Sequence, residues 1–310
     1  MTFLLLFSLL ASTATTELSD LVGLEAPPSP FTLDDEAPVN LELVQEQASP
    51  APEKVKPDIF YVPTPQRLVD LMLLMAGVKQ DDLLYDLGSG DGRLVITAAK
   101  TFGARGIGIE IDPALLAIAR RNARRAKVED KVEFRQQDLF KSDFKDASVI
   151  TLYLLDELNR RLRPQILEQV KPGTRVVSHA FHMGEWQPDA ERTLTIDGKK
   201  YDAYFWVVPA NVNGRWTVKS STRGMPATLV IEQTYQEFAV RASGGGDVIG
   251  AGKLDGREFY LTLSKTADAA AVSFNGTVEG DSIKAKASDG RESWSAEREA
   301  GTEKPIEPQA

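Results

Sequence analysis

The chain has 310 residues, a length that favours about two domains, and it contains no cysteine. The absence of cysteine excludes disulfides, thiolate metal sites and a cysteine nucleophile. The formal net charge is −9, and residues 1–53 account for all of it, with nine acidic residues and neither Lys nor Arg. The rest of the chain is therefore neutral. This speaks against binding to polyanionic nucleic acid, because proteins that bind nucleic acid generally carry an excess of Lys and Arg.

An apolar run lies over residues 3–10. It is too short to span a bilayer but is typical of a signal peptide, with small residues that favour cleavage after Ala14. We therefore predict a signal-peptide-like segment over residues 1–14 and export to the periplasm or cell envelope, with a cytoplasmic location as the alternative. Residues 15–57 are rich in Pro, Ala and acids without any period, and they predict a disordered linker.

The first predicted helix follows the segment Tyr-Val-Pro-Thr-Pro at residues 61–65. Apolar residues recur at helical spacing over residues 66–76. Thr64 is in position to cap this helix, with Pro65 at the first helical position.

Residues 82–93 contain the most informative pattern of the sequence. An apolar run ends at Asp86, and glycines follow at positions 88, 90 and 92 before an apolar segment of helical character. A strand, a glycine turn and a helix in this order open a doubly wound α/β domain, whose ligands bind beyond the carboxyl ends of the strands. A dinucleotide is one candidate ligand, but its fingerprint is G-x-G-x-x-G, and here the third glycine comes one residue early.

Acids at two predicted strand ends favour a different ligand. Asp86 would repel a pyrophosphate but suits an ammonium group, and Glu110 closes the next apolar run, where it can accept both hydroxyls of a ribose. S-adenosylmethionine (SAM) carries an amine, a ribose and a sulfonium. We therefore predict a SAM site, with a glycine turn that serves only chain reversal as the alternative.

Four segments extend this pattern: YVPTP at 61–65, DLGSGDGR at 86–93, DLFK at 138–141 and RVVSHAFHMGEWQP at 175–188. With them the chain resembles the class I SAM-dependent methyltransferases over residues 58–209. Within that class it is similar to the branch of small protein-lysine methyltransferases acting on mitochondrial inner-membrane proteins and their bacterial relatives. The resemblance implies an α/β fold with a Rossmann-like seven-stranded methyltransferase sheet and SAM as cofactor. It implies a cofactor site made from Tyr61, Thr64, Asp86, Gly88, Ser89, Gly90, Glu110, Ile111, Asp138 and Leu139.

After the glycine turn, strand and helix patterns alternate as such a sheet requires. The predicted elements are strands ending at Glu110, Asp138 and Leu155, helices over 113–127 and 156–170, a strand over 175–179, and a hairpin of 191–196 with 201–208 around Asp197-Gly198. Four arginines at helical spacing predict a solvated helix face: Arg120, Arg121, Arg124 and Arg125.

The strand end at Tyr153 lacks a motif found in enzymes that methylate planar nitrogens, and this speaks against such nitrogens as the acceptor. Enzymes that methylate planar amide or adenine nitrogens carry Asn/Asp-Pro-Pro-Tyr/Phe there, whereas this chain has Leu-Tyr-Leu-Leu. Two histidines without a third ligand argue against zinc, so no metal is predicted. Phe181 and Trp186 either wall a channel for a lysine side chain or belong to the core. The catalytic candidates are Tyr153, Asp156, His179 and His182, and structural hydrogen bonding is the alternative for both histidines.

From Asn211 onward the pattern changes to short alternating segments. Eight of them within residues 211–300 predict a small antiparallel β-barrel or curled meander, in which Trp216 and Trp294 meet where the sheet closes. Turn signals separate the segments, among them Asn275-Gly276. Residues 301–310 are predicted to be a disordered tail. The predicted domains are thus a methyltransferase domain over 58–210 and this β domain over 211–300.

These patterns favour a SAM-dependent methyltransferase, with a lysine of a protein as the preferred acceptor and nucleic acid as an improbable partner. One alternative is a methyltransferase that acts on a small molecule. Another is a SAM-sensing binding protein whose β domain binds a ligand. No transmembrane span is predicted.

Overall fold

The computed structural model describes residues 61–220, 227–242, 249–264 and 271–306. The predicted signal-like segment and the linker up to residue 57 lie outside the described residues, as do residues 307–310.

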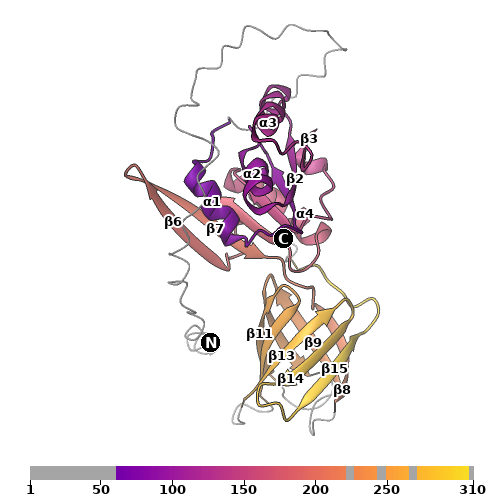
Figure 1. Ribbon diagram of the computed structural model, residues 1–310. Helices are drawn as coiled ribbons and strands as arrows, with labels where there is room; N and C mark the ends of the chain where they lie inside the picture. Colours follow the sequence, from indigo (N-terminus) through magenta and orange to yellow (C-terminus); the bar gives the residue numbers. More distant parts are fainter. Residues whose placement is uncertain (1–60, 221–226, 243–248, 265–270, 307–310) are drawn as a thin grey trace. The chain divides into compact units, whose positions relative to one another are not determined.

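The first half of the described chain forms a seven-stranded sheet with the strand order β3-β2-β1-β4-β5-β7-β6 (Figure 1). Strands β1 to β5 are parallel to one another, and β7 is antiparallel to both β5 and β6. The strands are β1 (Leu83–Leu87), β2 (Arg105–Glu110), β3 (Val132–Gln136), β4 (Val149–Leu152), β5 (Arg175–His179), β6 (Ala190–Ile196) and β7 (Lys199–Val207). The predicted α/β class is therefore confirmed.

Burial explains why the central strands are continuous apolar runs. All four residues of β4 are buried, as expected for a parallel strand covered on both faces. The chain leaves β1 toward β2 on one side, while β4 lies on the other side, so the carboxyl end of β1 is the point where the strand order reverses. Open α/β sheets bind their ligands at such a point.

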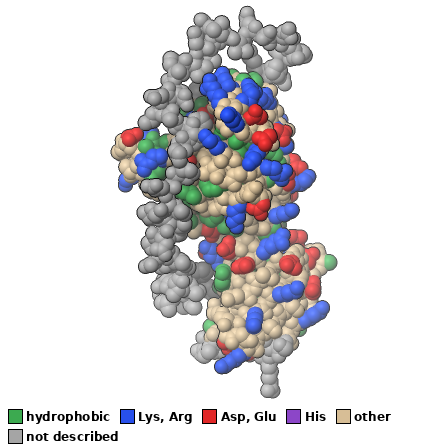
Figure 2. All heavy atoms as spheres, viewed as in Figure 1, with side chains coloured by type: hydrophobic (Ala, Val, Ile, Leu, Met, Phe, Trp, Pro, Cys, Tyr) green, Lys and Arg blue, Asp and Glu red, His purple; other side chains and the backbone are tan. Residues whose placement is uncertain are grey.

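Helix α1 (Gln66–Met75) precedes the first strand. The helices between strands are α2 (Arg93–Thr97), with a π-helical turn over Ala98–Phe102, α3 (Pro113–Ala126) and α4 (Asp156–Gln169). The side chain of Asp112 caps α3 by accepting a hydrogen bond from the Ala114 amide at 2.8 Å. The four arginines of α3 are exposed, which confirms the predicted solvated face, and Figure 2 shows basic side chains gathered at this end of the molecule.

Two local predictions have different outcomes. The Asp197-Gly198 turn is confirmed, because both residues have positive φ (50° and 79°), as a two-residue hairpin turn between right-twisted strands requires. The predicted capping role of Thr64 is wrong. Pro65 occupies the cap position of α1, where no side-chain cap forms, and the Thr64 hydroxyl instead lies 3.1 Å from His179 Nδ1.

The second half of the described chain forms a closed antiparallel barrel with the strand order β10-β11-β12-β13-β14-β15-β8-β9. Its strands are β8 (Gly214–Ser220), β9 (Thr228–Thr234), β10 (Glu237–Ala242), β11 (Ile249–Asp255), β12 (Glu258–Ser264), β13 (Val272–Glu279), β14 (Ser282–Ala287) and β15 (Ser293–Arg298). The pairing of β8 with β15 closes the barrel, with Trp216 opposite Arg298 and Trp294 opposite Ser220. Both tryptophans belong to the barrel core, and closure removes the sheet edges that a meander would leave.

One predicted turn of the barrel is wrong. Asn275 and Gly276 lie inside β13, and the chain turns later, at Gly280, which has a φ of 58°. A Cβ atom at position 276 would lie 2.3 Å from the Lys284 carbonyl oxygen and 2.4 Å from the Phe259 ring. This glycine therefore leaves room for an aromatic side chain within the sheet and does not mark a turn.

Residues 301–306 also differ from the prediction of a disordered tail. The Asn213 side chain donates a hydrogen bond of 2.8 Å to the Pro305 carbonyl, and the Asn211 side chain donates one of the same length to the Lys304 carbonyl. Ile306 is only 7% exposed and belongs to a core cluster that includes Trp186 and Tyr235. Hydrogen bonds and apolar burial together order this segment.

The buried position of Ile306 leads to a stability prediction. Replacing Ile306 by Ala should lower the free energy of unfolding by about 2–5 kcal/mol, because a large-to-small change leaves a cavity in the core. The melting temperature should fall by several degrees, as measured by circular dichroism. Lys304→Ala is the matched control, since that side chain is exposed and only its backbone carbonyl is hydrogen bonded. Equal melting temperatures for the two variants would contradict the prediction.

Candidate functional site

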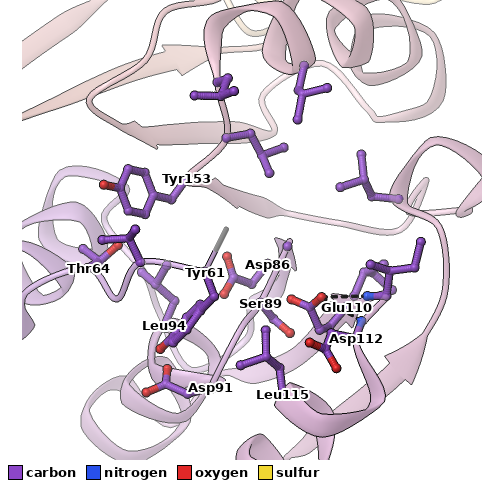
Figure 3. A pocket seen from close by; sticks show the side chains of 18 of the residues that line it. Tyr61, Thr64, Asp86, Ser89, Asp91, Leu94, Glu110, Asp112, Leu115 and Tyr153 are labelled. Carbon is purple, nitrogen blue, oxygen red and sulfur yellow. Dashed lines mark hydrogen bonds between the residues drawn. The ribbon is translucent and has the colours of Figure 1, made fainter. Parts of the chain in front are cut away.

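A cavity of about 760 Å³ lies at the carboxyl ends of β1, β2 and β4 (Figure 3). This volume is within the range of small-molecule sites. Most of the predicted site residues line this cavity: Tyr61, Thr64, Asp86, Gly88, Ser89, Glu110, Ile111, Asp138, Leu139 and Tyr153.

The glycine turn between β1 and α2 forms the floor of the site. Gly88, Gly90 and Gly92 all have positive φ, at 89°, 53° and 82°. A Cβ atom on Gly90 would lie 2.3 Å from the Tyr61 ring, and one on Gly92 would lie 2.6 Å from the Phe134 ring. Glycine is therefore required at these positions for both backbone geometry and space. Gly90 does not line the cavity, so the structure gives it a supporting position.

Asp86, on β1, is the most deeply buried carboxyl group of the site. It is 3% exposed, and the Thr151 hydroxyl donates a hydrogen bond of 2.6 Å to its Oδ1. Burial raises the pKa of Asp86 to about 8, and the nearby charges of Glu110 and Asp91 act in the same direction. A cationic group in the cavity would favour the ionised form. Asp86 is thus suited to pair with an ammonium.

Glu110, at the end of β2, is held by three backbone amides. Gly90 N donates to Oε2 at 2.9 Å, while Ile111 N and Asp112 N donate to Oε1 at 2.8 and 3.0 Å. Because an ionised carboxylate has about four acceptor sites, one remains on Oε2 for a donor in the cavity. This fixed orientation suits a sugar hydroxyl.

Ser89 borders the cavity, but its hydroxyl is directed toward β2. The hydroxyl oxygen is buried, has no hydrogen-bond partner within the described part of the chain, and would lie 2.6 Å from a Cβ atom on Gly108.

The charge of the cavity lining is predominantly negative. Arg93 is neutralised by Asp91, with Nη2 2.7 Å from Oδ2, and Arg161 lies over the Phe140 ring at 3.8 Å. The carboxylates that line the cavity are Asp86, Asp91, Glu110, Asp112 and Asp138. An acidic lining disfavours a pyrophosphate and favours a ligand with positive charges.

Tyr153 and Phe181 lie on the side of the cavity beyond β4 and β5. His179 lies behind this wall and does not line the cavity. It is 3% exposed, and its ring stacks on Tyr153 with 3.7 Å between ring centroids. Burial, followed by the charge of Lys199, lowers the pKa of His179 to about 4, so its imidazole is neutral at physiological pH.

Asp156 and His182 also lie outside the cavity lining. The Asp156 carboxylate accepts a hydrogen bond of 2.8 Å from the His182 amide, and the His182 ring packs on Tyr204 at 3.9 Å. These contacts match the structural alternative considered for His182. Trp186 is fully buried, so it belongs to the core and does not wall a channel.

Sequence patterns did not reveal how the segment before α1 is held against the glycine turn. Arg93 Nη1 donates a hydrogen bond of 2.6 Å to the Thr64 carbonyl, and Arg93 Nε donates one of 3.0 Å to Asp91. The Asp91-Gly-Arg93 spacing is visible in the sequence, but its partner lies 29 positions earlier in the chain. No local signal connects the two.

Known proteins are similar to part of this chain. A profile of the ANTKMT methyltransferase domain matches residues 86–190. A protein-lysine N-methyltransferase of Saccharolobus islandicus is 38% identical over 153 residues, which are 49% of this chain and 95% of the relative. The adenine nucleotide translocase lysine N-methyltransferase of Mus musculus is 34% identical over 107 residues, 34% of this chain and 47% of the relative.

Among solved structures, an RNA methyltransferase from Salinibacter ruber in complex with S-adenosyl-L-homocysteine is 56% identical. The match covers 49% of this chain and 96% of that chain, with a TM-score of 0.46.

The strand order of the sheet and the acidic, glycine-floored cavity define a class I SAM-dependent methyltransferase. The chain belongs to the family of the ANTKMT methyltransferase domain, whose relatives include protein-lysine N-methyltransferases. The amide-held Glu110 and the buried Asp86 fit SAM as the cofactor.

The two carboxylates lead to a binding prediction. Asp86→Ala and Glu110→Ala should each weaken SAM binding by about 1.5–3 kcal/mol, the contribution of a hydrogen bond to a charged group. Isothermal titration calorimetry measures this directly. Asp143→Ala serves as the control, since Asp143 is an exposed acid paired with Lys145 and does not line the cavity. Unchanged SAM affinity in both site variants would overturn the cofactor assignment.

The raised pKa of Asp86 leads to a stability prediction of defined sign. A folded-state pKa above the unfolded value contributes stability at low pH, and this contribution is lost as the pH rises through about 8. Without SAM, Asp86→Asn should therefore be more stable than the wild type, with a gap that widens from pH 5 to pH 8. Urea unfolding at several pH values measures the gap. A constant difference across that range would contradict the prediction.

Proposed function

We propose that the protein transfers a methyl group from SAM to the side-chain amine of a lysine in a protein. The observation that carries this proposal is the apolar wall that adjoins the acidic part of the cavity. It consists of Tyr153, Leu154, Leu155, Leu158 and Phe181. A long aliphatic side chain with a terminal amine fits such a wall. The protein-lysine N-methyltransferase of Saccharolobus islandicus, 38% identical to this chain, supports the same acceptor.

Binding and orientation are the main tasks of the residues around the cofactor. Asp86 is proposed to hold the cofactor amine and Glu110 to accept one ribose hydroxyl, while the bare glycine turn allows close approach to the backbone. When bound, SAM supplies an electrophilic methyl group on its sulfonium. Holding a nucleophile in line with that group accounts for a large part of the rate enhancement in such reactions.

The acceptor amine must lose its proton before it reacts, because an ammonium has no lone pair. Burial raises the pKa of Tyr153, so its phenol stays neutral and can offer a hydrogen bond without holding a charge. The apolar side chains of Leu154 and Phe181 exclude water from the amine and thereby favour its neutral form. Desolvation and positioning, not a dedicated base, are therefore proposed to prepare the amine.

Radiolabelled SAM tests the acceptor class. The protein is incubated with SAM carrying a labelled methyl group and a host-cell lysate, and the label is then followed in protein, RNA, DNA and small molecules. We expect methyllysine in the protein fraction and its absence with Asp86→Ala. Label recovered only on nucleic acid or on a small metabolite would overturn the acceptor while leaving the cofactor site intact.

The pKa of His179 leads to a prediction for the pH profile of transfer. Because this pKa is about 4, His179 does not titrate between pH 6 and pH 9. The value of kcat/KM should rise with pH as the acceptor amine loses its proton, with no inflection near the usual histidine pKa of about 6.5. A His179→Gln variant should keep the shape of this profile. An inflection near neutrality that disappears in the variant would instead identify His179 as the base.

Export remains a proposal, supported by the apolar run over residues 3–10 and the small residues before position 15. Within the described ranges, no helix is long and apolar enough to cross a membrane.

A further inference from the structure

Exposed apolar side chains gather at the opening of the methyltransferase cavity. In the described part of the chain, the exposed large hydrophobic residues are Tyr61 (42%), Val62 (56%), Leu74 (57%), Leu155 (46%) and Tyr260 (55%). Tyr61, Val62 and Leu155 all line the cavity. They are therefore at once part of its wall and open to solvent, and we call these three residues the apolar mouth.

The apolar mouth is built from two segments that are far apart in the sequence. Tyr61 and Val62 precede α1, whereas Leu155 connects β4 to α4. His179 joins the two segments, because its Nδ1 lies 3.1 Å from the Thr64 hydroxyl and its ring stacks on Tyr153. Arg93 ties the first segment further through the Thr64 carbonyl. Buried contacts behind the mouth thus fix both of its sides.

Charges beside the mouth suit an approaching cation. Asp156 and Glu157 directly follow Leu155 in the first turn of α4, and both are exposed. Within the cavity, Arg93 is paired with Asp91 and leaves the lining acidic. A lysine side chain would therefore enter between acidic groups, while the residues flanking that lysine would meet the apolar mouth.

We infer that the apolar mouth selects a lysine flanked by large apolar side chains in a polypeptide. This inference rests on the proposed lysine methylation and specifies the sequence context of the acceptor. Covering the exposed parts of Tyr61, Val62 and Leu155 with apolar neighbours removes hydrophobic surface from water, whereas polar neighbours gain nothing there. A polynucleotide would bring phosphates to the same surface and lose their hydration.

Two peptides of equal length and charge test the inference. Each carries one central lysine, flanked on both sides by Leu and Val in one peptide and by Ser in the other. We expect kcat/KM to be about ten-fold higher for the apolar peptide, the factor that the burial of one apolar side chain contributes. Equal kcat/KM for the two peptides would overturn the inference, and so would transfer to lysate proteins with none to either peptide.

Substitutions assign the preference to the mouth. Val62→Ser and Leu155→Ser should each lower the ratio of kcat/KM between the apolar and the serine peptide. SAM affinity, measured in parallel, distinguishes loss of the mouth from damage to the cofactor site. Leu74→Ser and Tyr260→Ser are matched controls of similar exposure that do not line the cavity, and they should keep the wild-type ratio.

The outcomes separate this inference from the proposed function. An equal fall of the ratio in the Leu74→Ser control would show that the effect is not local, and it would overturn the inference. Methylation of both peptides with equal efficiency leaves lysine as the acceptor and removes only the apolar selectivity. No methyllysine in peptides or in lysate protein would instead remove the proposed function itself.

Discussion

The hydrogen bond between Gly90 N and Glu110 Oε2 joins the carboxyl ends of the first two strands. It forms only because the chain turns through three left-handed glycines, which bring a bare amide beside a carboxylate. The same turn leaves Asp86 buried next to Glu110, and the Ser89 hydroxyl without a partner among the described residues. Burial and the charge of Glu110 keep Asp86 mainly protonated near neutral pH, so a cation in the cavity would favour ionisation of both acids.

Local chemistry explains how much of this site was visible in the sequence. Asp86 and Glu110 each end an apolar run, and β1 places its acid directly before the glycines, so strand, turn and site could be read together. The contact of Thr64 with His179 joins residues 115 positions apart, and no local pattern in the sequence could predict it. Threonine is a common residue type at the N-cap of a helix, but the Thr64 hydroxyl contacts the buried ring of His179 instead. Here a tertiary contact replaced the local preference.

The barrel shows the same limit in another form. Alternation of apolar and polar residues predicted its strands closely, because one face of each strand is buried. The pair Asn275-Gly276 is a residue combination typical of hairpin turns, yet it lies inside a strand. The Phe259 ring occupies the space where a side chain at position 276 would lie. Residues 301–306 contain one large apolar side chain, that of Ile306, and its burial was not evident from composition. Packing partners distant in sequence decided both cases.

The barrel also lies outside residues 86–190, which the profile of the methyltransferase domain matches. The Gln236 side chain nevertheless donates a hydrogen bond of 2.8 Å to the Gln187 carbonyl, in the segment that follows β5. Tyr235 stacks on Trp186 with 6.1 Å between ring centroids. This half of the chain therefore contributes to the packing behind the apolar wall of the cavity.

The cofactor cavity also has a consequence for the lifetime of the protein in a cell. A ligand that binds only the folded state shifts the equilibrium away from unfolded chains, and quality-control proteases remove those chains. Because SAM binds the folded state, the steady-state amount of the protein should follow the supply of its methyl donor. Starvation for sulfur amino acids would then reduce the abundance of the protein as well as its turnover rate.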